Sequence, residues 1–363
     1  MEKMELKDIL SKSYKNKKVF VTGHTGFKGA WLILLLHKLG AEVKGYALQP
    51  EERSLYNDIS GDNFCESIIG DIRDQSNLIK ELHAFQPDFV FHLAAQPLVL
   101  ASYEHPVYTY ETNVMGTVYL LDAIRQMEKK CHVVMITTDK VYENKEWLYP
   151  YRETDRLGGF DPYSSSKASS EIAIASFIKS FFPVEQYNQH QKAVAVVRAG
   201  NVIGGGDWAT NRIIPDIVKA LSNEETIKVR NPRAVRPWQH VLEALIGYLQ
   251  IGKKLSEEND IAVWASAWNF GPLYDEFVDV ETLVQNAVEI WGSGNYEAVE
   301  VKQPHEAKLL RLDCSKASNL LGWQPQKNAS EAINFTIQWY KAVLQEKIPA
   351  SDYTNQQIDE YLG

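Results

Sequence analysis

The feature that most constrains this chain is the junction between a predicted strand and a predicted helix near the N-terminus. Residues 18–22 form a short β-rich run that leads into Gly23-His24-Thr25-Gly26-Phe27-Lys28-Gly29 and then into a helical pattern. Glycines at this spacing permit a tight turn, let the backbone approach a pyrophosphate and leave N–H groups of the helix N-terminus facing negative charge. The junction therefore predicts a dinucleotide site rather than a glycine-rich turn that binds nothing. The residues expected beside the cofactor are Gly23, Thr25, Gly26, Phe27 and Gly29.

The N-terminal half alternates short β-rich runs with helical stretches. The further predicted strands are residues 42–47, 88–92, 133–137 and 193–198, and the predicted helices are residues 27–39, 74–85, 103–127 and 163–181. This alternation is typical of an α/β fold with a doubly wound parallel sheet. We predict a Rossmann domain over residues 15–200 and a smaller, mainly substrate-binding lobe over residues 201–346, some of whose segments return to the first domain.

Charge and cysteine content exclude several classes of protein. The 38 basic and 47 acidic side chains give a formal net charge of −9, which offers no basic face to a nucleic-acid backbone. The longest apolar run, residues 30–36, is far shorter than a membrane span, and the first eighteen residues lack a signal-peptide core. Cys65, Cys131 and Cys314 have neither disulfide-framework nor metal-site spacing. We expect a soluble cytoplasmic protein that binds small molecules and no metal.

Further strand ends bear on the dinucleotide. The second strand ends in Lys44-Gly45-Tyr46-Ala47-Leu48, without the acidic residue that usually holds the ribose of NAD, and Arg53 follows. We expect NAD, with NADP left open. Each of the next two strand ends could also be an ordinary one, but their order along the chain fits a dinucleotide. Asp71 and Ile72 are expected near the adenine, Leu93, Ala94 and Ala95 near the phosphates and ribose, and Gln96 near the substrate.

A tyrosine and a lysine lie four residues apart where a helix is predicted to begin. Tyr163 and Lys167 therefore occupy one face of that helix, about a turn apart. A phenol is a poor base at neutral pH, but a nearby ammonium stabilises the phenolate and lowers its pKa. Such a pair is common on solvated helices, yet behind a dinucleotide-binding half it predicts a base that acts on a sugar hydroxyl.

A second polar group follows the predicted strand 133–137. Thr138, Asp139 and Lys140 lie at the carboxyl edge of the predicted sheet, where such folds bind ligands. A hydroxyl, a carboxyl and an amine in succession could bind a sugar hydroxyl, protonate a leaving oxygen and take a proton from carbon. The alternative is a solvated Asp-Lys turn.

Taken together, these residues resemble the extended short-chain dehydrogenases, and among them the nucleotide-sugar 4,6-dehydratases. The resemblance spans residues 17–323 and rests on the strings at residues 23–29, 200–208 and 236–241. The dTDP-glucose branch of that family carries Thr-Asp-Glu after the fifth strand. Here Thr138-Asp139-Lys140 is similar to the CDP-glucose branch instead.

The resemblance implies a role for each of these residues. Tyr163 and Lys167 are then the dehydrogenase pair beside the nicotinamide cofactor, Thr138 steadies the sugar, Asp139 is the acid toward the C6 hydroxyl and Lys140 occupies the place of the C5 base. Since a lysine must lose its proton before it acts as a base, this last role requires a lysine pKa that is lowered by burial or by a cationic neighbour. The implied nucleotide-sugar contacts are Asn201, Arg236 and, more weakly, Arg212, each arginine also being compatible with a surface ion pair.

The implied reaction oxidises C4 by hydride transfer to NAD⁺, eliminates water across C5 and C6, and returns the hydride to C6. Other readings remain open. A nucleotide-sugar 4-epimerase needs the same cofactor turn and Tyr-Lys pair but no acid and base for elimination. A 4,6-dehydratase that acts on another nucleotide hexose is a further alternative, whereas a redox-sensing binding protein should lack the Tyr-Lys pair.

Two helical stretches contain more apolar residues than one sheet face requires. They are Val107, Tyr110, Val114, Val118 and Leu121 on one stretch and Ile174, Phe177, Ile178 and Phe181 on the other. Apolar helical stripes can pair in a four-helix interface, so we expect a homodimer or tetramer. Burial within one subunit is the alternative.

Overall fold

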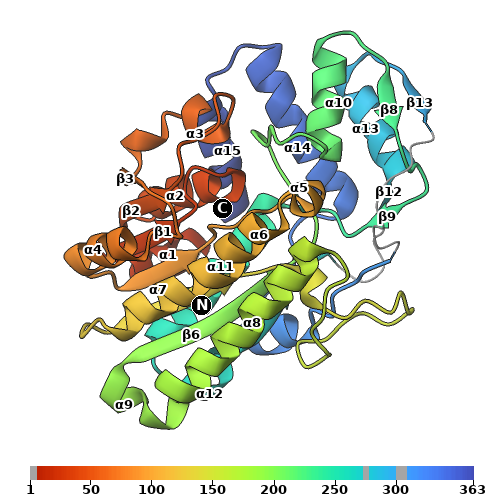
Figure 1. Cartoon of the computed structure of the whole chain (residues 1–363). Coiled ribbons are helices and arrows are strands. Elements are labelled where there is room, and N and C mark those ends of the chain that lie inside the picture. Colours follow the sequence, from red (N-terminus) through yellow and green to blue (C-terminus); the bar gives the residue numbers. More distant parts are fainter. Residues whose placement is uncertain (1–5, 273–277, 300–308) are drawn as a thin grey trace.

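One parallel sheet lies at the centre of the computed structural model, which describes residues 6–272, 278–299 and 309–363 (Figure 1). Across this sheet the strands are β11 (Ala267–Phe270), β6 (Lys192–Ala199), β5 (Cys131–Ile136), β4 (Phe89–His92), β1 (Lys18–Thr22), β2 (Glu42–Ala47) and β3 (Glu66–Ile69). The chain leaves β1 through β2 and β3, then returns to β4 on the other side of β1. The predicted doubly wound fold is confirmed, and its ligand crevice is expected where β1 and β4 end.

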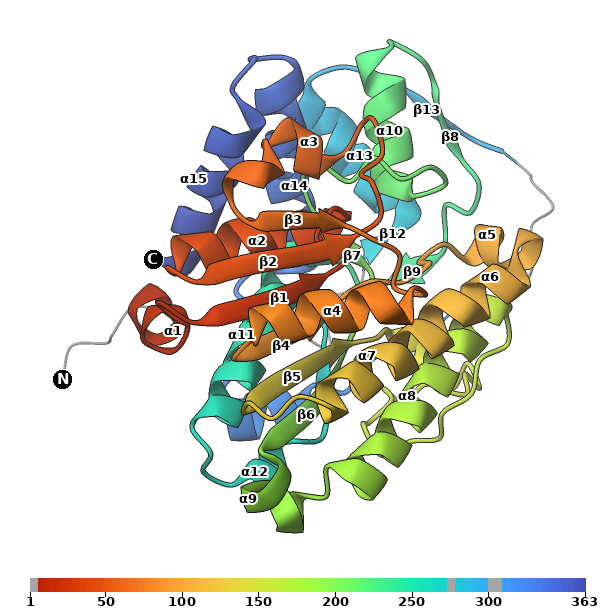
Figure 2. The ribbon, with the colours of Figure 1, turned by 60° about the vertical axis from the view of Figure 1, so that its left-hand side comes forward.

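Helices cover both faces of the sheet (Figure 2). On one face lie α4 (Gln75–Phe85), α7 (Gly116–Arg125) and α8 (Pro162–Phe181), and on the other lie α2 (Phe27–Lys38) and α11 (Val241–Ser256), with α1 (Leu6–Tyr14) against α11. Alternate residues of a strand enter different cores: Phe20 packs with α4 and α7, whereas Val19 and Val21 pack with α2 and α11. Residues 29–36 of α2 are all buried because this helix also contacts α15 (Ala350–Leu362).

The continuous helix predicted over residues 103–127 is wrong, because Pro106 interrupts it. The segment contains α5 (Val99–Glu104), α6 (Pro106–Tyr110), the π-helical turn η2 (Glu111–Met115) and α7. Proline disfavours helical geometry in the residue before it, and His105 has φ −129° and ψ 61°. The break brings α5 against α8, where Tyr163 N donates to Ser102 Oγ (3.1 Å).

Segments after residue 201 form a smaller group of elements and also rejoin the sheet. The smaller group contains α10 (Ile213–Ser222), α13 (Val280–Trp291), α14 (Ala329–Leu344) and the strand pairs β7 (Val202–Ile203) with β10 (Gln239–His240), β9 (Val235–Arg236) with β12 (Val278–Asp279), and β8 (Ile227–Val229) with β13 (Tyr296–Ala298). By contrast, α11 packs on β5 and β6, and β11 extends the main sheet. Among the residues described, none of the helices has the length and apolar character needed to cross a membrane.

The short elements that remain connect these layers. They are α3 (Leu55–Asp58), η1 (Gly61–Asn63), η3 (Asp139–Val141), η4 (Val184–Gln186), α9 (Tyr187–His190), α12 (Ile261–Trp264) and η5 (Ala317–Leu321). Of these, η3 matters for function, since it follows β5 at the carboxyl edge of the sheet.

Candidate active site

The turn after β1 consists of glycines where a side chain would collide with neighbouring backbone. Gly23 has φ +77°, and a Cβ there would lie 2.7 Å from Ala94 N at the end of β4. A Cβ at Gly29 would lie 2.1 Å from Gly23 O. Gly26 begins α2 without a side-chain cap, so the first N–H groups of this helix have no acceptor in the helix. The cradle fits a pyrophosphate, because the positive end of the helix dipole faces it.

Side-chain hydrogen bonds hold this turn against the adjacent strand ends. Thr25 Oγ1 donates to Leu48 O beyond β2 (2.9 Å), and Ala94 N donates to Thr22 Oγ1 (3.2 Å). Phe27 packs against the larger hydrophobic core. The predicted cofactor residues Leu93, Ala94 and Ala95 are half-buried along the same edge.

The segments after β2 and β3 bear on the choice of dinucleotide. Asp71 accepts hydrogen bonds from Arg73 Nε (3.0 Å) and Nη2 (2.7 Å), and this hydrogen bonding lowers the pKa of the Asp71 carboxyl. Ile72 beside it is buried. Arg53, the residue that left NADP open, has its guanidinium 3.6 Å from the ring centroid of Trp208. This contact fixes the position of Arg53 against Trp208.

Gln96 lies next to this edge, but its side chain bonds within the protein. Its Nε2 donates to Thr109 Oγ1 (2.8 Å) and its Oε1 accepts from Leu98 N (2.6 Å). The backbone N–H of Gln96 also donates to Asn113 Oδ1 (2.8 Å). These bonds make Gln96 part of the loop before α5, and its contact with the substrate stays a prediction.

Helix α8 brings Tyr163 and Lys167 to the site. Asp161 caps the helix by accepting from Ser164 N (2.9 Å), which fixes where the helix starts. Both Tyr163 and Lys167 are buried, and Lys167 Nζ donates to Ile136 O at the end of β5 (3.1 Å). The helix is therefore joined to the strand that precedes Thr138.

The charged groups around Tyr163 and Lys167 include more than the sequence predicted. Burial raises the pKa of the Tyr163 phenol, while the Lys140 ammonium and a hydrogen bond with Thr138 oppose that rise. Burial lowers the pKa of Lys167 to about 8, and the Glu171 carboxylate acts in the opposite direction. The sequence suggested Lys167 as the cation that stabilises the phenolate. In the structure the Lys140 ammonium acts to lower the pKa of the phenol, and the Lys167 amine donates to the Ile136 carbonyl.

The structure places Thr138, Asp139 and Lys140 together at the end of β5. Thr138 caps the turn η3, and its hydroxyl donates to Asp139 Oδ1 (2.9 Å). Lys140 Nζ lies 3.4 Å from the same oxygen. Asp139 is 1% exposed, and its charge acts to raise the pKa of the Tyr163 phenol, so the two side chains are neighbours in the site. Because they adjoin Tyr163, these groups can act on neighbouring atoms of one substrate.

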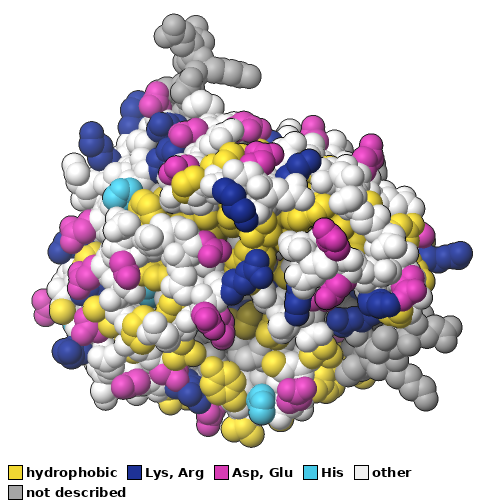
Figure 3. Space-filling model, turned by 90° about the horizontal axis from the view of Figure 1, so that it is seen from above, with side chains coloured by type: hydrophobic (Ala, Val, Ile, Leu, Met, Phe, Trp, Pro, Cys, Tyr) yellow, Lys and Arg dark blue, Asp and Glu magenta, His cyan; other side chains and the backbone are white. Residues whose placement is uncertain are grey.

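Asn201 and Arg236, two candidate substrate residues, each adjoin in sequence a residue that lies near the same carboxyl. A Cβ at Gly200, next to Asn201, would lie 3.4 Å from Asp139 Oδ2 and 3.1 Å from Pro237, which follows Arg236. Arg212 Nη1 forms an ion pair with Asp207 (2.8 Å), and its charge lowers the pKa of Tyr163. On the face seen in Figure 3, Lys and Arg side chains border a hollow with hydrophobic side chains on its floor.

Lys28 is a site residue that the sequence interpretation did not assign. Burial lowers its pKa to about 7, and the cations Arg212, Lys167 and Lys140 add to that shift while Asp139 opposes it. Lys28 therefore lies among the predicted catalytic groups. The sequence feature that could have identified Lys28 is its place in the first turn of α2, where the helix dipole disfavours a cation.

Comparisons with known proteins agree with this geometry. The sequence matches the family model described as GDP-mannose 4,6 dehydratase over residues 20–336. A CDP-glucose 4,6-dehydratase of Salmonella typhimurium is 48% identical over 331 residues, covering 91% of this chain and 92% of that protein.

Two solved structures show the same fold at low sequence identity. The UDP-glucuronic acid 4-epimerase of Bacillus cereus, in complex with UDP-glucuronic acid and NAD, aligns with a TM-score of 0.75 at 22% identity, covering 90% of this chain and 99% of that one. DesIV, a dTDP-glucose 4,6-dehydratase of Streptomyces venezuelae with NAD and TYD bound, aligns with a TM-score of 0.73 at 23% identity, covering 89% and 97%.

Proposed function

Since this chain belongs to the GDP-mannose 4,6-dehydratase family, we propose that it is an enzyme that converts CDP-glucose into CDP-4-keto-6-deoxyglucose and water. The 48% identity to the Salmonella typhimurium CDP-glucose 4,6-dehydratase supports this substrate. The observation that carries the proposal is the arrangement of Tyr163 beside Thr138, Asp139 and Lys140, which supplies groups for oxidation and for elimination in one site.

NAD is the cofactor that the site fits. The turn at residues 23–29 would hold its pyrophosphate, Asp71 and Ile72 would lie at the adenine, and residues 93–95 would line the ribose and phosphates. Tyr163 and Lys167 would lie at the nicotinamide end. When bound, NAD supplies the hydride acceptor and donor for the sugar.

The chain's own residues move the protons. The Lys140 ammonium and the Thr138 hydroxyl stabilise the Tyr163 phenolate, and its Oη then takes the proton of the C4 hydroxyl and becomes the neutral phenol. Oxidation at C4 acidifies the C5 proton. Once the Lys140 ammonium has passed a proton to the Asp139 carboxylate, 3.4 Å away, the neutral Lys140 amine, or a water that it positions, removes the C5 proton. Asp139 gives its proton to the departing C6 oxygen, so that water leaves. Asn201, Arg212 and Arg236 bind the nucleotide diphosphate at the mouth of the site.

A nucleotide-sugar 4-epimerase is the second candidate, since a UDP-sugar 4-epimerase shares this fold with a TM-score of 0.75. Epimerisation needs Tyr163 and the cofactor but no proton donor at C6. The buried Asp139 beside Lys140 therefore favours dehydration. A 4,6-dehydratase for another nucleotide hexose is a further candidate, and the 48% identity to the CDP-glucose enzyme favours CDP-glucose over it.

We also propose a cytoplasmic homodimer, or a tetramer built from such dimers. Of the predicted apolar stripes, Leu121 and Ile174 are buried within the subunit, whereas Val107, Tyr110 and Phe181 are exposed. Met115 in η2 and Ile172 in α8 are exposed as well. Pairing these helices with a second copy would cover the patch. A monomer in light scattering at micromolar concentration would contradict this assembly.

The function is tested by incubating the enzyme with CDP-, dTDP-, GDP- and UDP-glucose in parallel. We expect CDP-glucose to give the alkali-dependent ultraviolet absorbance of a 4-keto-6-deoxy sugar and a product lighter by one water. Turnover of another nucleotide sugar instead would establish the alternative substrate. A product of unchanged mass would establish epimerisation.

A further inference from the structure

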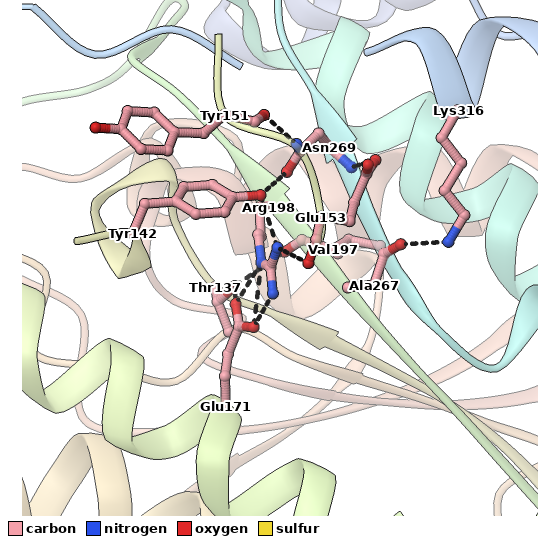
Figure 4. Close-up of polar contacts among 10 residues, drawn as sticks. All are labelled: Thr137, Tyr142, Tyr151, Glu153, Glu171, Val197, Arg198, Ala267, Asn269 and Lys316. Atoms are coloured by element: carbon pink, nitrogen blue, oxygen red, sulfur yellow. Dashed lines mark hydrogen bonds and ion pairs between the residues drawn. The ribbon is translucent and has the colours of Figure 1, made fainter. Parts of the chain in front are cut away.

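Beneath the proposed catalytic residues lies a buried ion pair that the mechanism above does not use. Glu171 on α8 and Arg198 on β6 are 4% and 3% exposed. Arg198 Nε donates to both carboxylate oxygens of Glu171 (2.9 and 3.1 Å), and its Nη2 also contacts Oε2. Figure 4 shows the guanidinium lying directly against the carboxylate, between the sheet and α8.

The polar atoms around this pair are hydrogen-bonded. Glu171 Oε1 also accepts from Thr137 Oγ1 (2.6 Å), and Arg198 Nη1 donates to Tyr142 Oη (2.6 Å). Tyr142 in turn donates to Asn269 Oδ1 on β11 (2.8 Å). A buried ion pair is weak evidence for stability, because desolvation offsets its attraction and apolar residues of similar volume often serve as well. The role of the pair is therefore better judged from the segments that it holds in place than from its contribution to stability.

The network joins the two segments that carry the proposed catalytic groups. Glu171 is four residues after Lys167, so both lie on one face of α8. Thr137, bonded to Glu171, directly precedes Thr138, and Tyr142, bonded to Arg198, follows η3. The pair thus fixes α8 against both ends of the segment 138–140.

The charged and titratable groups near Lys167 come from several elements. Glu171 lies on its own helix, His92 on β4 and Lys28 on α2, and Asp139 in η3 faces Lys28. Burial lowers the pKa of His92 to about 3, so this ring is neutral. Burial also lowers the pKa of Lys28 to about 7, so its charge changes near neutral pH. Glu171 is the anion that opposes the effect of burial on the pKa of Lys167.

We propose that Glu171, held by Arg198, is a positioning residue for the dehydrogenase pair: its carboxylate places an anion one helical turn from Lys167, and its bond to Thr137 sets the strand end that bears Thr138. The proposal rests on the function assigned above to Tyr163 and Lys167. A merely structural carboxylate would affect folding without changing the pH range over which the enzyme works.

The test is the pH dependence of kcat with CDP-glucose for the wild type, Glu171→Gln and Glu171→Asp. Removing a charge near a buried group shifts its pKa by about one to three units. We therefore expect the alkaline limb of the profile to move to lower pH by about one unit or more in Glu171→Gln. Glu171→Asp keeps the charge and should keep the wild-type limb, even if kcat falls.

A matched control is Glu243→Gln, which changes another fully buried carboxylate on α11, one that is absent from the charges acting on Lys167. Glu243→Gln should lower the unfolding temperature and leave the alkaline limb of the kcat profile unchanged. If Glu171→Gln folds poorly because Arg198 is left unpaired, Glu171→Gln/Arg198→Met replaces both charges. It should move the alkaline limb in the same direction but less far, because the loss of the Arg198 cation opposes the loss of the Glu171 anion.

The outcomes separate this inference from the proposed function. No turnover of CDP-glucose by the wild type contradicts the function. Wild-type turnover with an unshifted limb in Glu171→Gln, or in the double variant, contradicts the positioning role alone.

Discussion

Glu171 and Glu243 are both buried carboxylates, yet they lie in contrasting surroundings. Glu243, at the start of α11, accepts hydrogen bonds from the Tyr361 hydroxyl and from the backbone N–H groups of Gln326 (3.0 Å) and Lys327 (2.9 Å). Each of these donors is neutral, and they come from segments near the C-terminus. Burial raises the pKa of Glu243. This carboxylate anchors the C-terminal segments to α11.

Glu171 instead has a cation as its main partner and lies one helical turn from Lys167. Its second partner, Thr137, adjoins Thr138 in the proposed active site. Two carboxylates of equal burial thus differ in what they can do: one can only hold segments together, whereas the other also supplies charge to a proposed catalytic lysine. Variants that separate folding from turnover test this contrast.

The largest expected effect comes from removing one hydroxyl in each region. Tyr163→Phe should lower kcat by about 10² to 10⁴, because the general base is lost while the ring remains. Tyr361→Phe should leave kcat nearly unchanged and lower the free energy of unfolding by about 1 to 3 kcal/mol, because Glu243 loses a buried donor. Steady-state kinetics and chemical denaturation of both variants measure this. Equal loss of activity in the two variants would contradict the contrast.

Within the active-site region, Asp139→Asn should separate oxidation from elimination. Asparagine keeps the shape of the side chain but has no acidic proton for the C6 oxygen, so we expect the overall rate to fall by about 10² or more. Reduced nicotinamide should then accumulate after mixing with CDP-glucose, whereas in the wild type its absorbance should rise and decay. If none accumulates, Asp139 is not the acid.

Lys140→Met addresses the other half of the elimination. The variant keeps an unbranched side chain but lacks the amine, so uptake of deuterium at C5 from heavy water should slow by about 10². The first hydride transfer should be slowed less, through loss of the cation near Tyr163. Mass spectrometry of the product gives the exchange rate, and wild-type exchange would remove Lys140 from the role of base.

The smallest expected effect concerns stability at Lys28. Its pKa in the folded protein is about 7, below the ordinary value of 10.5, so between these values the unfolded chain binds more protons and wild-type stability rises with pH. Lys28→Met removes this dependence. Its unfolding temperature, measured without cofactor, should exceed that of the wild type at about pH 6 and by less at about pH 9. A difference that does not change with pH would contradict the burial of this charge.

Much of the fold could be predicted because local patterns and tertiary structure agree. β1, β2 and α2 were expected within a residue or two, since their apolar runs and glycine turn are local signals. The break at Pro106 was missed although proline signals it. α15 was missed because its buried face includes Thr354 and Gln357, which weaken the hydrophobic period.

The candidate site was predictable only where its residues form motifs. Thr138, Asp139 and Lys140 are consecutive, and Tyr163 and Lys167 share a helix turn, so their spacing was informative. The Glu171–Arg198 pair joins residues 27 positions apart. In sequence, these two residues resemble an ordinary helix residue and an ordinary strand residue, and only the fold brings them together.

The central claim is that this enzyme dehydrates CDP-glucose through a temporary oxidation at C4. The most direct measurement uses CDP-glucose deuterated at C4 and locates the label in the product by mass spectrometry and NMR. We predict a CDP-4-keto-6-deoxyglucose that has lost one water and carries the deuterium at C6. A product that retains its water and carries the deuterium at C4 would contradict the account and establish an epimerase.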